Sequence, residues 1–245
     1  MISVIISILI ATAVTLGLNF TIDDSLWFSI VIGIILGFVY FLYMTKKVTK
    51  ELEKINEKAQ KAIQTQNFDR AINIYKAGLS LKGKGLLVEG QVYSFMGMLY
   101  YIKKDKEMAF ETLKKATSFN WVAKGMLAIL YMNNKELDLM EKTFEKMTTS
   151  SKKEGLVWGL YAYCLAKLKR TDEAIKILEK GMTKMKSEDE RLKVNILELK
   201  NGRKMKMKVF GDPWYQFMLE QPPRKRMQQQ AGPQYGKIKK NQAYR

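Results

Sequence analysis

The first 45 residues are almost continuously apolar, and the pattern changes abruptly at Lys46. Two stretches, Ile2–Ile22 and Ser25–Thr45, contain no charged residue over 21 positions each. A helix of that length is about 31 Å long at ~1.5 Å per residue, which matches the hydrocarbon core of a bilayer. Only Asp23 and Asp24 separate the two stretches. We therefore expect residues 1–45 to form a transmembrane hairpin with spans at about 2–22 and 25–45.

The distribution of lysine around the apolar stretches predicts an orientation. Lys46, Lys47 and Lys50 follow the second stretch directly, whereas no basic residue lies between the two stretches. Because basic flanks stay in the cytoplasm, we expect an integral protein of a bacterial inner (cytoplasmic) membrane, with both termini and the polar part of the chain cytoplasmic. A cleaved signal peptide is an alternative, since residues 11–13 have a small-x-small form, but no basic residue precedes the first apolar run.

Small residues four positions apart in these stretches allow close approach of two helices. Gly33 and Gly37 form the clearest pair. They fit two uses, packing of the hairpin against itself or formation of a homo-oligomer, and the pattern leaves both open. Neither stretch carries an ionisable residue in its interior, so a proton relay or an ion path through the hairpin is not expected.

From Lys46 onwards, apolar residues recur at spacings of three and four, which predicts a succession of helices. Residues 66–79 and 169–182 are close copies that share Ala-x3-(Tyr/Leu)-x2-Gly. A third copy lies at residues 104–116, and a degenerate fourth copy fits if Met140 takes the place of the small residue. The four anchor positions are 71, 109, 140 and 174, with spacings of 38, 31 and 34, so the pattern is an internal repeat.

This pattern resembles the tetratricopeptide repeat, a helix-turn-helix unit of about 34 residues. The resemblance covers roughly residues 51–187. It implies an all-α fold, with an α-solenoid of about four repeats over residues 46–202. The spacing of 38 places extra length at Leu81–Glu89. The packing positions of the family fall here on Ala59, Ala71, Tyr75, Gly97, Ala109, Leu113, Trp158, Ala162, Ala174 and Leu178.

The same resemblance implies a concave groove, lined by the first helix of each repeat, that binds a peptide or helix of a protein partner. The groove positions in this sequence are Asn56, Gln60, Ile63, Ser94, Met98, Tyr101, Ile129, Met132 and Tyr163. Methionine and aromatic side chains suit an adaptable surface for an amphipathic helix. The alternative is that Met98, Met132 and Tyr163 belong to the core between repeats.

Two elements are expected after the last repeat. Residues 188–201 have a helical pattern with Leu192, Ile196 and Leu199 on one face, which suits a helix that caps the array. Asp212 and Pro213 then predict the start of a short aromatic helix over residues 214–219. We expect residues 203–220 to fold back on the repeats as a second cap or to form an exposed docking peptide.

The C-terminal tail, residues 221–245, is rich in proline, glutamine and basic residues and poor in aliphatic ones, which predicts disorder. Three uses of this tail remain open: binding of anionic lipid, binding of nucleic acid, and no partner at all. Each basic residue near an anionic membrane surface contributes about 1 kcal/mol. The candidate contacts are Arg224, Lys225, Arg226, Lys237, Lys239 and Lys240.

Composition excludes most catalytic chemistry. The chain has 42 Lys and Arg against 24 Asp and Glu, no histidine and one cysteine, Cys164. Without histidine there is no imidazole base and no histidine-ligated metal, and one cysteine makes no internal disulfide. We therefore expect no enzyme, no cofactor and no metal site. The sequence favours a membrane-anchored scaffold or adaptor, with a nucleic-acid or ribosome tether and a structural subunit of a larger membrane complex as the alternatives.

Overall fold

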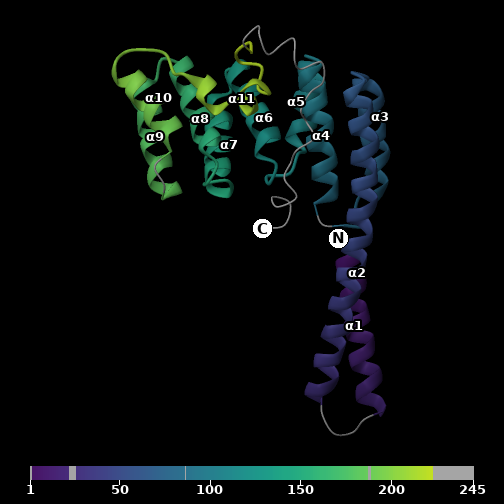
Figure 1. Ribbon diagram of the computed structural model, residues 1–245. Coiled ribbons are helices and arrows are strands. Elements are labelled where there is room, and N and C mark those ends of the chain that lie inside the picture. Colours follow the sequence, from purple (N-terminus) through teal and green to yellow (C-terminus); the bar gives the residue numbers. More distant parts are fainter. Residues whose placement is uncertain (1, 22–25, 86, 187–188, 223–245) are drawn as a thin grey trace. The chain divides into compact units, whose positions relative to one another are not determined.

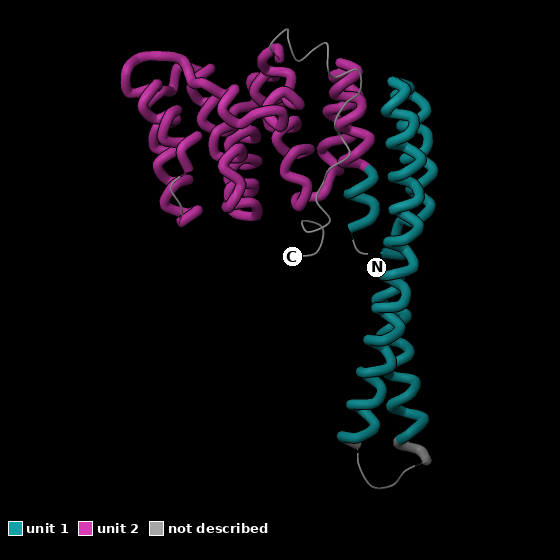
Figure 2. The backbone as a smooth tube through the Cα atoms, viewed as in Figure 1, with its two compact units in different colours: residues 1–92, 232–245 teal, residues 93–231 magenta. Residues whose placement is uncertain are grey.

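The computed structural model describes residues 2–21, 26–85, 87–186 and 189–222, and the regular elements within these ranges are all helices (Figure 1). The described residues form two compact units, one that ends at Val92 and one that begins at Tyr93 (Figure 2). The first unit holds α1 (Ile2–Thr21), α2 (Leu26–Gln64), α3 (Phe68–Ala77), the short 3-10 helix η1 (Gly78–Leu81) and the start of α4 (Val88–Ile102). The second unit holds the rest of α4 and α5 (Lys106–Lys114), α6 (Trp121–Asn133), α7 (Leu137–Ser150), α8 (Gly155–Lys167), α9 (Thr171–Met185), α10 (Glu190–Lys200), η2 (Met207–Phe210) and α11 (Asp212–Tyr215).

In the first unit, α1 and α2 pack side by side as the expected hairpin (Figure 1). Small residues line their contact. A Cβ atom placed on Gly37 would lie 2.6 Å from the carbonyl oxygen of Ser7, and one on Gly33 would lie 2.5 Å from that of Ala11. No larger residue fits at either position, so these glycines close the hairpin itself. Homo-oligomerisation through the same two glycines would require the hairpin to open.

The second apolar stretch and the first helix of the first repeat are one continuous helix. α2 runs for 39 residues to Gln64, well past the change of composition at Lys46. Residues 46–64 contain neither glycine nor proline, so nothing in the sequence interrupts the helix. The polar half of α2 pairs with α3, and the small side chains of Ala59 and Ala71 are fully buried, as the repeat signature predicts. Tyr75 is also buried, and burial raises the pKa of its hydroxyl group.

The turn inside each repeat has the same backbone conformation in all four copies. Gln66, Lys104, Lys135 and Lys169 have φ between 57° and 64°, and each lies five residues before an anchor position. At the last turn, the Lys169 amide donates to the Ala166 carbonyl and the Arg170 amide to the Leu165 carbonyl, both at 3.0 Å. Equivalent pairs of hydrogen bonds close the other three turns. All four turns therefore share the Schellman pattern at the expected register, including the turn of the degenerate copy.

The signature residues of the second unit pack in the core. Ala109, Met140 and Ala174 are all fully buried where the two helices of a repeat meet. A Cβ atom on Gly97 would lie 2.7 Å from the side chain of Leu113, so this glycine permits the approach of α4 and α5. The remaining signature residues of this unit, Trp158, Ala162 and Leu178, are buried as well. α10 covers the end of the array with Leu192, Ile196 and Leu199 buried, as the pattern predicts.

Candidate functional site

The predicted groove of the second unit is filled by the chain itself. Residues 203–220, here called the groove-filling segment, return from the end of α10 across the first helices of the repeats. Five apolar side chains of this segment are buried, namely those of Met205, Met207, Phe210, Trp214 and Phe217. Of the two expectations for these residues, folding back is the one that the structure shows. The segment lies in the groove and is not an exposed docking peptide.

Two glycines create the space for its aromatic side chains. A Cβ atom on Gly159 of α8 would lie 2.6 Å from Cζ of Phe210, and one on Gly125 of α6 would lie 2.9 Å from Cε1 of Phe217. The spacing of these glycines equals that of the anchors Met140 and Ala174, so they occupy the same position in neighbouring repeats. They were not among the predicted site residues. The signal that could have found them is a glycine inside each of two helices at the repeat spacing, where helix propensity disfavours glycine.

Tyrosines at predicted groove positions hold the end of the segment. The Tyr101 hydroxyl group donates a hydrogen bond of 2.7 Å to the carbonyl oxygen of Phe217. The ring of Tyr163 packs edge to face on Trp214, with centroids 4.8 Å apart. The indole Nε1 of Trp214 donates to Glu220 at 3.0 Å. Burial, helped by the negative charge of Glu220, raises the pKa of Tyr163 to about 12.

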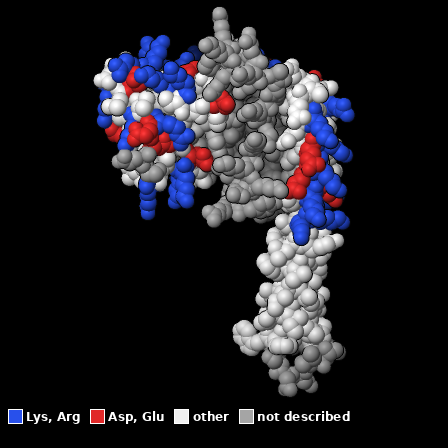
Figure 3. Space-filling view, viewed as in Figure 1, with Lys and Arg blue, Asp and Glu red and all other residues white. Residues whose placement is uncertain are grey.

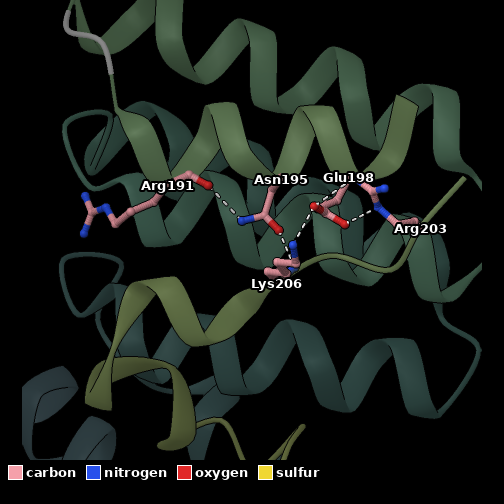
Figure 4. Close-up of polar contacts among 5 residues, drawn as sticks. All are labelled: Arg191, Asn195, Glu198, Arg203 and Lys206. Atoms are coloured by element: carbon pink, nitrogen blue, oxygen red, sulfur yellow. Dashed lines mark hydrogen bonds and ion pairs between the residues drawn. The ribbon is translucent and has the colours of Figure 1, made fainter. Parts of the chain in front are cut away.

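A cluster of polar side chains joins α10 to the start of the groove-filling segment (Figure 4). The buried Asn195 side chain donates to the Arg191 carbonyl at 2.8 Å and accepts from the Lys206 amide at 2.7 Å. The carboxylate of Glu198, also largely buried, accepts from Nε of Arg203 and from Nζ of Lys206, both at 2.7 Å. These hydrogen bonds lower the pKa of Glu198 below its usual range, because they stabilise the charged carboxylate.

The short aromatic helix differs from its prediction. α11 covers Asp212–Tyr215, with Gly211 as its N-cap at a φ of 73°, and the helix is a single turn. The predicted helix over residues 214–219 was therefore wrong in extent, and Asp212 is its first residue rather than its cap. Met218 has a φ of 53°, which turns the chain after Phe217. The physical reason is that packing of Trp214 and Phe217 into the groove decides the backbone path here.

The other predicted groove residues lie in different surroundings. Asn56, Gln60 and Ile63 belong to α2 in the first unit. Ser94 and Ile129 are buried, and Met98 and Met132 are partly buried against the core. The candidate tail contacts, Arg224, Lys225, Arg226, Lys237, Lys239 and Lys240, lie outside the described residues. Within the described ranges, no cluster of His, Cys, Asp or Glu side chains could hold a metal ion.

Comparisons with known proteins agree with this architecture. The family model for the tetratricopeptide repeat matches residues 90–120 and 156–183, which contain most of α4 with α5 and most of α8 with α9. The chain therefore contains tetratricopeptide repeats, a unit that mediates protein–protein interactions.

Two solved structures are similar to the chain. A crystal structure of MamA has 18% sequence identity and a TM-score of 0.45, and the match covers 61% of this chain and 90% of that chain. A crystal structure of the MamA protein has 16% identity and a TM-score of 0.45, with 75% and 92% covered. No curated protein matched the sequence.

Proposed function

We propose that this protein is a membrane-anchored scaffold. The hairpin of α1 and α2 spans the bilayer, and the tetratricopeptide repeats assemble partner proteins at the cytoplasmic face. The membrane anchor is supported by the distribution of side chains on the hairpin. A water-soluble helix pair buries its large apolar side chains, whereas this hairpin exposes them.

Large apolar side chains of the hairpin point outwards, and small ones point inwards. Leu16, Trp27 and Phe28 are 71%, 79% and 63% exposed, whereas Ser3 and Ser29 are buried between the helices. On the face shown in Figure 3, the described hairpin surface carries no charge, and Lys and Arg gather where α2 enters the repeats. By length and composition, the described helix Trp27–Gln64 could cross a membrane, and Ile2–Leu18 is a shorter apolar helix. An apolar exterior with small residues at the helix contact is typical of membrane helices.

The continuity of α2 supports the scaffold part of the proposal. Because the second span and the first repeat share one helix, no flexible linker separates them. The first repeat therefore stays next to the bilayer, and the anchor raises the effective concentration of partners that the array binds there. Lys46, Lys47 and Lys50 at the end of the span favour the cytoplasmic side.

The filled groove constrains how a partner binds. The groove positions Tyr101 and Tyr163 already contact Phe217 and Trp214 of the groove-filling segment. In this proposal, a partner that uses those positions displaces the segment, and a partner that binds with the segment in place uses the surfaces of the array that the segment leaves open.

Membrane insertion can be tested with a matched pair of variants. Ile35 is 54% exposed on the hairpin and Leu197 is 59% exposed on α10. Lysine at the centre of a span costs about 2.5–3.5 kcal/mol on insertion. We expect Ile35→Lys to move a large fraction of the protein into the alkaline-carbonate supernatant, and Leu197→Lys to leave it in the membrane pellet. Extraction of the unsubstituted protein by carbonate would refute the anchor.

The partner and the orientation need separate measurements. In sealed inside-out vesicles, we expect trypsin to degrade the repeats, and in right-side-out vesicles to leave them intact.

Crosslinking followed by affinity purification of the full chain from membranes identifies the partner, with Ile35→Lys as the control for capture that depends on the anchor. Recovery of the same proteins with the released variant would contradict recruitment at the membrane.

A further inference from the structure

The longest connection between repeats lies beside the end of the hairpin. The wide spacing between the anchors Ala71 and Ala109 places the extra length after α3, and there η1 leads into Lys82–Gly85, here called the juxtamembrane loop. Gly83 has a φ of 78°, which a glycine adopts without strain. Leu81 anchors the start of this connection in the core, and the surroundings of the loop in the first unit indicate what the rest of it does.

Two contacts hold the juxtamembrane loop at the boundary of the apolar hairpin. The Ile2 amide of α1 donates a hydrogen bond of 2.8 Å to the Gly83 carbonyl. A Cβ atom on Gly85 would lie 2.7 Å from Cγ1 of Val48, so the loop backbone touches α2 as well. Ile2 opens the first apolar stretch, and Val48 lies just after the second. The loop therefore lies where both apolar stretches meet the charged part of the chain.

The side chains at this boundary have the chemistry of a membrane interface. Lys82 and Lys84 of the loop are exposed, as are Lys46, Lys47 and Lys50 on α2. Lys82 forms an ion pair of 2.7 Å with Glu89, at the start of α4. Leu87, just beyond the loop, is 43% exposed. Exposed lysines beside an exposed leucine match a surface that lies against anionic headgroups.

We propose that the juxtamembrane loop is a second membrane contact. Lys84, together with Lys46, Lys47 and Lys50, binds the headgroups of anionic lipids, and Leu87 lies at the level of the headgroups. This inference rests on the proposed membrane anchor. A hairpin by itself can rotate and tilt in the bilayer, whereas a hairpin with a lateral contact at its boundary holds the first repeat in one orientation.

Site-directed fluorescence on the full chain tests the contact. An environment-sensitive NBD label is placed at Leu87→Cys in nanodiscs of phosphatidylcholine with a quarter of phosphatidylglycerol, and headgroup-labelled nitroxide lipid is the quencher. Burial raises the pKa of Cys164 to about 12, so this thiol stays protonated and reacts slowly with the label. Labelling of the unsubstituted protein gives the background. Gln66→Cys is the matched control. It lies in the turn just after Gln64, where α2 ends, and Gln64 is about 24 Å along the helix from Val48 at the boundary.

We expect at least threefold stronger quenching at residue 87 than at residue 66. Ile35→Cys with a nitroxide on the acyl chain reports separately whether the hairpin is in the bilayer. Quenching at residue 35 together with equal, weak quenching at residues 87 and 66 would overturn the loop contact and leave the anchor intact. Absence of quenching at residue 35 would overturn both proposals.

The role of the lysines is tested by charge. We expect Lys84→Gln, or replacement of phosphatidylglycerol by phosphatidylcholine, to reduce the quenching at residue 87 by half or more. Lys61→Gln removes an exposed lysine near the far end of α2 and should leave it unchanged. Quenching that is equal in both lipids and insensitive to Lys84→Gln would overturn the binding of anionic headgroups.

Discussion

Phe217 lies so close to the backbone of α6 that a Cβ atom on Gly125 would be 2.9 Å from its ring. The same relationship recurs one repeat later between Phe210 and Gly159. These two contacts explain why glycine occupies the middle of two helices. They also explain how α6 and α8 accommodate a segment of the same chain.

The first prediction concerns Gly159. Valine in a helix is normally more favourable than glycine, but here its side chain meets the ring of Phe210. We expect Gly159→Val to lower the free energy of unfolding by about 1–3 kcal/mol, measured by thermal unfolding of the full chain in detergent. In the double variant with Phe210→Ala, the total loss should be smaller than the sum of the two single losses. Full additivity would show that the two residues do not share this site.

The second prediction concerns the occupancy of the groove. Trp214 is fully buried against Tyr163, and truncation of a buried aromatic side chain costs about 3–5 kcal/mol. We expect Trp214→Ala to release the groove-filling segment and to make the bonds after Lys206 and Lys208 at least tenfold more sensitive to trypsin. Met218→Ala, at an exposed neighbouring position, is the control. Capture of a groove-binding partner should increase in the first variant and not in the second.

The third prediction concerns acid. The pKa of Glu198 is lower in the folded chain than its ordinary value of 4.5, because Arg203 and Lys206 hydrogen-bond to its carboxylate. Its contribution to stability is therefore complete above the unfolded pKa and is lost as the pH falls through the folded pKa. We expect the start of the segment to become sensitive to an acid-active protease as the pH falls below about 4.5. Glu198→Gln should show the same exposure at neutral pH, measured with trypsin, because its side chain carries no charge at any pH. An unchanged pH profile in this variant would assign the acid step to another group.

The fourth prediction concerns the left-handed turn residues. Lys169 has a φ of 63°, a conformation that costs a residue with a side chain about 1–2 kcal/mol and costs glycine little. After allowance for the greater freedom of glycine in the unfolded chain, we expect Lys169→Gly to stabilise the protein by up to about 1 kcal/mol. Lys180→Gly, at an exposed position inside α9, should destabilise it by about 1 kcal/mol. Chemical denaturation of both variants measures the difference, and a loss of stability in Lys169→Gly would contradict the turn geometry.

Periodicity was sufficient for much of the fold. The anchors Ala71, Ala109, Met140 and Ala174 were placed correctly because each repeat buries its small or slender residue at the same local crossing of two helices. The continuity of α2 was missed because the change of composition at Lys46 suggested a boundary. Hydropathy reports the solvent around a helix, whereas the end of a helix depends on residues that interrupt its hydrogen bonds.

The helices predicted to line the groove carry a segment of the same chain. Tyr101 and Tyr163 contact this segment, whereas the resemblance to other repeat proteins implied a partner at these positions. Their contacts with Phe217 and Trp214 join segments that are far apart in the chain. No local pattern encodes a pairing over such a separation. Gly125 and Gly159, which the repeat pattern aligns, are the signal of this pairing in the sequence.

The sequence by itself determined the apolar hairpin, the four repeats and the capping helix, because each depends on spacing that is local to one or two helices. Only the tertiary structure decided that the groove is filled by residues 203–220, that Gly33 and Gly37 close the hairpin, and that the juxtamembrane loop touches Ile2 and Val48. These are contacts between segments distant in the chain. They depend on the shape that the packed helices leave, and spacing along the sequence does not contain that shape.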